Sequence, residues 1–83
     1  MSPILEQILE TYYEEVFMIA DGFDDAIIGV DESVPRLVYS SDKCIQILVD
    51  EGMDYMDAIE HFDYNVRGSY MGEKTPLFIS DHF

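Results

Sequence analysis

A segment with glycine at both ends, residues 52–68, most constrains what this chain can fold into. Asp54 is a favourable N-cap, and Asp57 follows it three residues later, as in the acidic variant of a capping box. The first glycine can stop a preceding helix, and the last can stop this one. The pattern predicts a helix from about residue 55 to residue 66.

The two faces of this predicted helix differ sharply in chemistry. Its apolar side chains recur at steps of three and four residues, which is the spacing of a packed helical face. The remaining positions are mainly acidic, so we expect one face to pack and the other to be negatively charged. The apolar set is Tyr55, Ala58, Ile59, Phe62 and Val66, and the outer set is Asp57, Glu60, Asp63 and Tyr64.

A second amphipathic stretch begins at the N-terminus. Ser2 and Pro3 are typical of an N-cap and of the first helical position, and we expect a helix over residues 3–20. Its outer face carries a row of like charges at i, i+4 spacing, with no Lys or Arg on the helix to relieve them. Each such pair costs roughly 0.2 to 0.5 kcal/mol. The row is Glu6, Glu10 and Glu14.

The middle of the chain predicts a hairpin followed by a helix. Residues 26–30 and 36–40 are short apolar runs separated by a turn, which favours two antiparallel strands. Ser41 is the expected cap of a helix over residues 42–50, which would form a helical hairpin with the next helix. A third strand is expected at residues 75–79, where a proline near its start is tolerated.

These elements predict a single acidic α+β domain spanning residues 1–83, in the order α-β-β-α-α-β. A small three-stranded sheet with helices packed mainly on one face would cover every apolar stripe. The sequence leaves the strand order open. We expect one core made of Ile8, Leu9, Val16, Ile28, Val38, Ile45, Leu48, Ile59, Phe62 and Phe78.

The charge balance restricts the partners of the protein. The chain has 18 Asp and Glu residues against 4 Lys and Arg, for a formal net charge of −14 at pH 7. Such a surface repels nucleic-acid phosphates and anionic lipid headgroups, which both bind through Lys and Arg. We therefore expect no direct nucleic-acid or membrane binding, and a partner with a basic surface.

No arrangement of residues indicates an enzyme, a cofactor or a metal site. Cys44 is the single cysteine, which excludes an internal disulfide, and its aliphatic neighbours predict a small core residue. His61 stands among acidic residues but lacks a second histidine at i+4, so we expect it on an acidic face rather than on a metal. Without a signal-like segment, a reduced intracellular protein is expected.

A C-terminal pattern resembles a group of small, mostly uncharacterised proteins of tailed bacteriophages. The similarity reaches back through Tyr39 and the strand around residues 27–30, and leaves the first helix outside it. The resemblance implies a viral protein made in the cytoplasm of a bacterial host, and it carries no functional residues over. The pattern consists of Gly52, Met53, Ala58, Phe62, Asn65, Gly68 and residues 72–78.

Two functions fit these features. In the first, a non-enzymatic phage protein binds and inhibits or redirects a host nucleic-acid-handling protein, because its carboxylates imitate phosphates. In the second, it is a small self-associating or virion-associated module held by tyrosine and strand-edge contacts, and acidity serves solubility. The partner's identity and the oligomeric state stay open. The expected partner-binding residues are Glu6, Glu10, Glu14, Asp57, Glu60, Asp63, Tyr64 and Tyr70.

Overall fold

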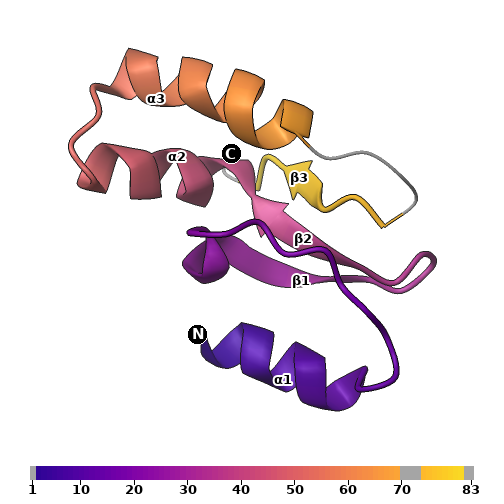
Figure 1. The fold of residues 1–83 in the computed structure, drawn as a ribbon. Helices are drawn as coiled ribbons and strands as arrows, with labels where there is room; N and C mark the ends of the chain where they lie inside the picture. The colour runs from indigo at the N-terminus through magenta and orange to yellow at the C-terminus, as the bar shows by residue number, and fades with distance from the viewer. Residues whose placement is uncertain (1, 70–73, 82–83) are drawn as a thin grey trace.

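The computed structural model describes residues 2–69 and 74–81, and it confirms the predicted α+β fold and the order of its elements. The helices pack mainly on one face of the sheet, as predicted. In Figure 1 α1 lies beside β1 at one end of the molecule, and α3 lies at the other end, beyond α2. A short 3-10 turn at residues 24–26 leads into β1. The elements are α1 (Pro3–Thr11), β1 (Ile27–Asp31), β2 (Arg36–Ser40), α2 (Ser41–Asp50), α3 (Tyr55–His61) and β3 (Leu77–Ile79).

The three strands form one mixed sheet in the order β1-β2-β3. β1 and β2 are antiparallel, as the turn between them predicts, with Ile27 opposite Tyr39 and Asp31 opposite Arg36. The register shifts between Ile27 and Gly29, so the strand carries an irregularity at that point. β3 pairs with β2 in parallel. A parallel pair needs a long crossover connection, and α2 and α3 lie within it.

The first helix is shorter than its sequence predicts. It begins as expected, since the Ser2 side chain accepts a hydrogen bond from the Leu5 N–H and Pro3 occupies the first turn. It ends at Thr11 rather than near residue 20. Thr11 and the two tyrosines after it are β-branched or aromatic, and such residues lose side-chain freedom in a helix. Tertiary contacts of the following residues then outweigh a weak helical preference.

Residues 15–20, which we call the strap, lead from α1 toward β1 without regular secondary structure. Phe17 and Ile19 are partly buried against the core, and Ala20 is fully buried. The Tyr12 ring meets the Phe17 ring edge-on at a centroid distance of 6.2 Å. Val16 was expected in the core and is instead 79% exposed, because it stands on the outer side of an extended segment rather than on a helical stripe.

The second and third helices begin at side-chain caps. The cap of α2 is Ser40 and not Ser41, since the Ser40 hydroxyl accepts from the Lys43 N–H at 3.2 Å. Ser41 is buried and its hydroxyl accepts from the Arg67 guanidinium at 2.9 Å. Asp54 caps α3 as predicted. After α3 the helical rod continues through a π-helical turn, residues 62–66, and a 3-10 turn, Arg67–Ser69. The rod therefore runs past its expected end at residue 66, and Gly68, which was expected to stop it, lies inside the last turn without a positive φ.

The buried core confirms some expected residues and corrects others. Of the predicted set, Ile8, Leu48 and Phe62 are buried, and Leu9, Ile45 and Phe78 pack partly buried against them. Ile28, Val38 and Ile59 are only half-buried and lie outside this cluster. The fully assembled cluster is Leu5, Ile8, Ala20, Phe23, Ala26, Ile27, Leu37, Tyr39, Cys44, Leu48, Ala58, Phe62 and Val66.

The error at β2 has a simple geometric cause. Successive side chains of a strand point to opposite faces, so either Val38 or its two neighbours could face the core. The structure buries Leu37 and Tyr39 completely. Tyr39 also contacts the Phe78 ring at a centroid distance of 5.3 Å, and that ring in turn meets Phe62 edge-on at 5.4 Å. This aromatic contact joins β2, β3 and α3.

Candidate partner-binding site

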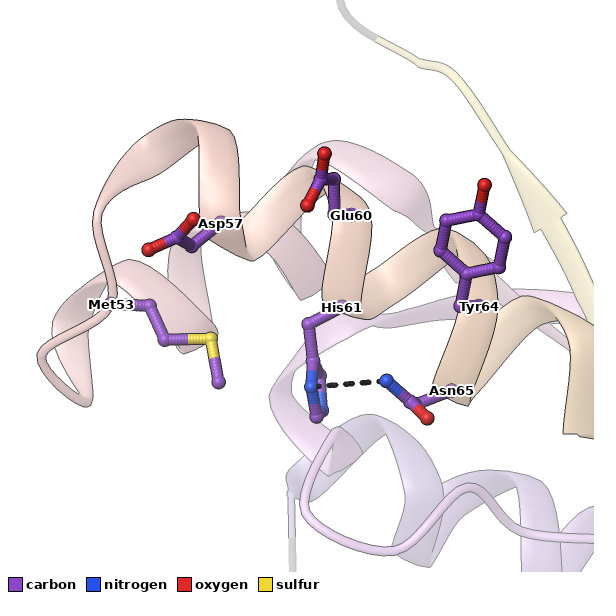
Figure 2. A pocket seen from close by; sticks show the side chains of 6 residues that line it. All are labelled: Met53, Asp57, Glu60, His61, Tyr64 and Asn65. Atoms are coloured by element: carbon purple, nitrogen blue, oxygen red, sulfur yellow. Dashed lines mark hydrogen bonds between the residues drawn. The ribbon is translucent and has the colours of Figure 1, made fainter.

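The outer face of α3 and of the π-helical turn carries the candidate site. Ala58 and Phe62 are buried on the inner side of this rod. The helical period therefore turns Asp57, Glu60 and Tyr64 away from the core, and all three are exposed. Figure 2 shows their side chains projecting from the same stretch of the rod.

A shallow depression of about 430 Å³ follows this face. Its lining comes from the rod and from the loop that precedes it, so the depression lies along one wall instead of between two. Small-molecule sites usually bury most of the ligand surface between several walls. The geometry suits contact with a protruding surface better than enclosure of a small ligand. The lining residues are Met53, Asp57, Glu60, His61, Tyr64 and Asn65.

His61 and Asn65 form a pair one helical turn apart within this depression. The Asn65 side-chain nitrogen lies 3.3 Å from His61 Nδ1, as the dashed line in Figure 2 marks. With the ring proton on Nε2, the amide donates to Nδ1 and fixes the ring orientation. His61 is half-buried. The expectation that it stands on the acidic face is confirmed.

The carboxylates of this face differ in how far they are neutralised. Asp63 lies 3.9 Å from Arg67, and both side chains are about half exposed, so this pair is weak. Asp57 and Glu60 make no ion pair with any residue that the structure describes. Their negative charge is therefore available to a partner.

The acidic residues near the N-terminus lie on α1 and just after it. Glu6 and Glu10 are exposed on α1, whereas Glu14 lies beyond the helix end, in the turn at residues 12–14. Of the predicted row of three glutamates, only Glu6 and Glu10 therefore lie on α1. In Figure 1 α1 and α3 lie at opposite ends of the molecule, and the expectation of one acidic surface shared by both helices stays a prediction. A sequence pattern shows which face of a helix is acidic but not where that helix packs.

Of the two tyrosines predicted for the site, the structure describes only one. Tyr64 is 80% exposed on the α3 face, while Tyr70 lies outside the described residues. Sequence reasoning missed two neighbours, Tyr55 and Met56, which are 61% and 65% exposed. Tyr55 was assigned to the packed face from its spacing. Tyr55 is the first residue of α3, directly after the cap. That position was the available signal of exposure, because a neighbouring helix need not extend far enough to cover the end of α3.

Cys44 has the environment of a structural residue. Its side chain is fully buried, as predicted. Burial raises the pKa of the thiol to about 12, and the nearby Arg67 guanidinium only partly opposes this change. At neutral pH the group is a protonated thiol rather than a thiolate, which is the nucleophilic form.

Within residues 2–69 and 74–81, no group of three or more His, Cys, Asp and Glu side chains is arranged to hold a metal ion. The helices of the same residues are all too short or too polar to cross a bilayer.

Comparisons with family models, with curated proteins and with solved structures gave no match to this chain.

Proposed function

We propose that this is a non-enzymatic binding protein that inhibits or redirects a host nucleic-acid-handling protein through the outer face of α3. One observation carries the proposal: Asp57 and Glu60 lack a cation partner among the described residues and stand beside the exposed ring of Tyr64. Proteins that handle nucleic acids offer Lys and Arg to phosphates, and the same groups bind carboxylates.

The shape of this face favours a small contact. In Figure 1 α1 lies at the other end of the molecule from α3, so the proposed contact does not depend on the carboxylates of α1. The proposed contact is a single helical face with two unpaired carboxylates and a central aromatic ring. It is not a long row of carboxylates that imitates the phosphates of a duplex. An Arg of the partner could bind a carboxylate and stack on Tyr64 at the same time.

The surrounding charge supports this contact at long range. The net charge of −14 produces a negative potential around the whole molecule, which speeds encounter with a basic partner. We propose that this contact forms in the cytoplasm of an infected bacterium, as the resemblance to phage proteins implies. The proposed partner is accordingly a host protein, and the proposed outcome is competition with its nucleic acid.

Affinity capture from a bacterial lysate with matched variants tests the proposal. One variant combines Asp57→Lys with Glu60→Lys, and its control combines Glu6→Lys with Glu10→Lys. The control changes the net charge equally on α1, at the other end of the molecule. We expect a captured nucleic-acid-binding protein to be lost with the first variant and retained with the control. Added duplex DNA or RNA should release it from the wild type.

Ionic strength provides the second readout. The screening length falls from about 10 Å at 0.1 M salt to about 3 Å at 1 M, so a charge-based contact should weaken steeply over this range. Capture that is independent of salt and survives the Asp57 and Glu60 replacements would contradict the proposal.

A tyrosine-centred interface is the second candidate function, and the exposure of Tyr64 together with Tyr55 and Met56 favours it. Apolar anchors lose little affinity in salt. Under this alternative the protein itself should self-associate, and Tyr64→Ala should abolish the association while the charge-reversed variants keep it. Sedimentation velocity of the purified variants at low and high salt separates the two functions.

A further inference from the structure

The strap presents alternating side chains, as an extended strand does. Phe17 and Ile19 point inward and are partly buried on the core. Val16 and Met18 are exposed on the outer side. This period of two residues is the pattern of a strand that has one face packed and one face free. The strap is nevertheless not part of the sheet.

The backbone of the strap has unused hydrogen-bonding groups. Its ends are tied down: the Glu15 N–H donates to the Tyr12 carbonyl oxygen, and the Ala20 N–H donates to the Tyr39 hydroxyl at 2.9 Å. Between them, the four N–H groups of residues 16–19 have no protein partner within the described part of the chain. Such a row is what an added strand pairs with.

The strap already binds one cation, and this contact indicates the charge of a suitable partner. Lys74 Nζ lies 3.0 Å from Glu15 Oε2 and 3.3 Å from the carbonyl oxygen of Val16. A carboxylate and a backbone carbonyl thus hold an ammonium group together. Glu10 and Glu14 are exposed nearby in sequence and carry further negative charge.

We propose that the strap binds an extended, lysine-containing segment of a partner protein by strand addition. Backbone hydrogen bonds to residues 16–19 would supply the affinity, and apolar side chains of the added segment would cover Val16 and Met18. A second copy of this chain is disfavoured as the occupant because both copies would carry a charge of −14. The strap contributes no residue to the depression along α3, so this is a second surface.

Amide hydrogen exchange of the ¹⁵N-labelled full chain tests the proposal. The probe is a short capped peptide that alternates lysine and valine, added to about 1 mM because weak peptide contacts have dissociation constants of this order. Alternate N–H groups of an extended strand point to opposite edges. With half of the protein bound at this concentration, we therefore expect roughly twofold slower exchange at one alternate pair only, either Val16 with Met18 or Phe17 with Ile19.

Two controls separate strand addition from simple charge attraction. The same peptide with every backbone nitrogen methylated keeps its charge, but it cannot donate to the strap carbonyl groups and its methyl groups block close approach of the two backbones, so it should give no protection. Val16→Lys should abolish the protection, whereas Met56→Lys makes the same change on α3 and should leave it intact. Because the two surfaces are separate, loss of the α3 contact would not affect this result.

Three outcomes would overturn the proposal. The first is equal protection of all four amides or of none at the highest peptide concentration. The second is protection by the methylated peptide. The third is protection that grows with protein concentration in the absence of peptide, which would make a second copy the occupant.

Discussion

The hydroxyl of Tyr39 lies 2.9 Å from the backbone nitrogen of Ala20, which donates a hydrogen bond to it, and both residues are completely buried. This bond joins the central strand β2 to the end of the strap. It satisfies a backbone donor that no water reaches, and it fixes the point at which the chain turns from the strap toward β1. A strand residue thereby determines the path of a segment nineteen positions earlier.

Replacing Tyr39 with Phe should destabilise the protein by about 1–3 kcal/mol. The substitution keeps the ring but leaves the Ala20 N–H buried without this acceptor, and an unsatisfied buried donor costs about that much. Urea unfolding followed by circular dichroism measures the change. Tyr64→Phe, which removes a hydroxyl from an exposed ring, is the control and should change stability by less than about 0.5 kcal/mol. Equal effects of the two substitutions would contradict the prediction.

Phe62→Ala should cost about 3–5 kcal/mol, a large share of the stability of a small domain. The side chain is 1% exposed, meets Phe78 edge-on at 5.4 Å and lies under the Arg67 guanidinium at 5.1 Å. Met56→Ala on the outer side of the same helix serves as the control, with an expected change below about 0.5 kcal/mol. Thermal unfolding is the measurement, and an unchanged melting temperature for Phe62→Ala would show that α3 is not packed on the core.

The stability of the protein should fall at alkaline pH in part through Cys44. Its pKa is raised from 9.0 to about 12 in the folded state, so the folded protein keeps a proton that the unfolded chain releases. The contribution is complete below about pH 9 and is lost progressively toward pH 12, at up to about 1.4 kcal/mol per pH unit.

The pH dependence of Cys44→Ala isolates this contribution. Urea midpoints measured from about pH 8 to about pH 10.5 should decline less steeply for the variant than for the wild type, because other titrating groups are common to both. Parallel slopes would contradict the raised pKa. Native protein should also resist alkylation by iodoacetamide until urea exposes the thiol.

The hairpin turn should contain an unusually acidic carboxyl group. The Ser33 hydroxyl and backbone N–H donate to Asp31 at 2.6 Å and 3.1 Å, and Arg36 Nε donates at 3.0 Å. These bonds, those of Ser33 first, hold the pKa of Asp31 below 3.8. The associated stability is present above pH 3.8 and is lost as the pH falls through the folded-state pKa.

NMR titration of the Asp31 carboxyl checks this prediction directly. We expect a midpoint below 3.8 in the wild type and a higher midpoint in Ser33→Ala, which removes the hydroxyl donor but keeps the backbone donor. A midpoint that Ser33→Ala leaves unchanged would show that Ser33 is not the main cause.

Local chemistry allowed the sequence to determine where the regular elements begin. Ser2 and Asp54 can satisfy free helical N–H groups from their own side chains, so both helix starts were predictable without knowing the fold. The hairpin followed from two short strands around a turn. The burial of Phe62 followed from helical spacing, and that of Cys44 from its aliphatic neighbours. Each of these depends on residues close together in the chain.

Only the tertiary structure decided how these elements face one another. The end of α1, the inward phase of β2 at Tyr39 and the parallel pairing of β3 depend on contacts between distant segments. The composition of the candidate site also depends on such contacts. The sequence pattern predicts an acidic face around Glu10 and another around Asp57 equally well, but it does not show where the two faces lie relative to each other. Periodicity specifies one face of one element, whereas the packing of the whole chain places α1 and α3 at opposite ends of the molecule.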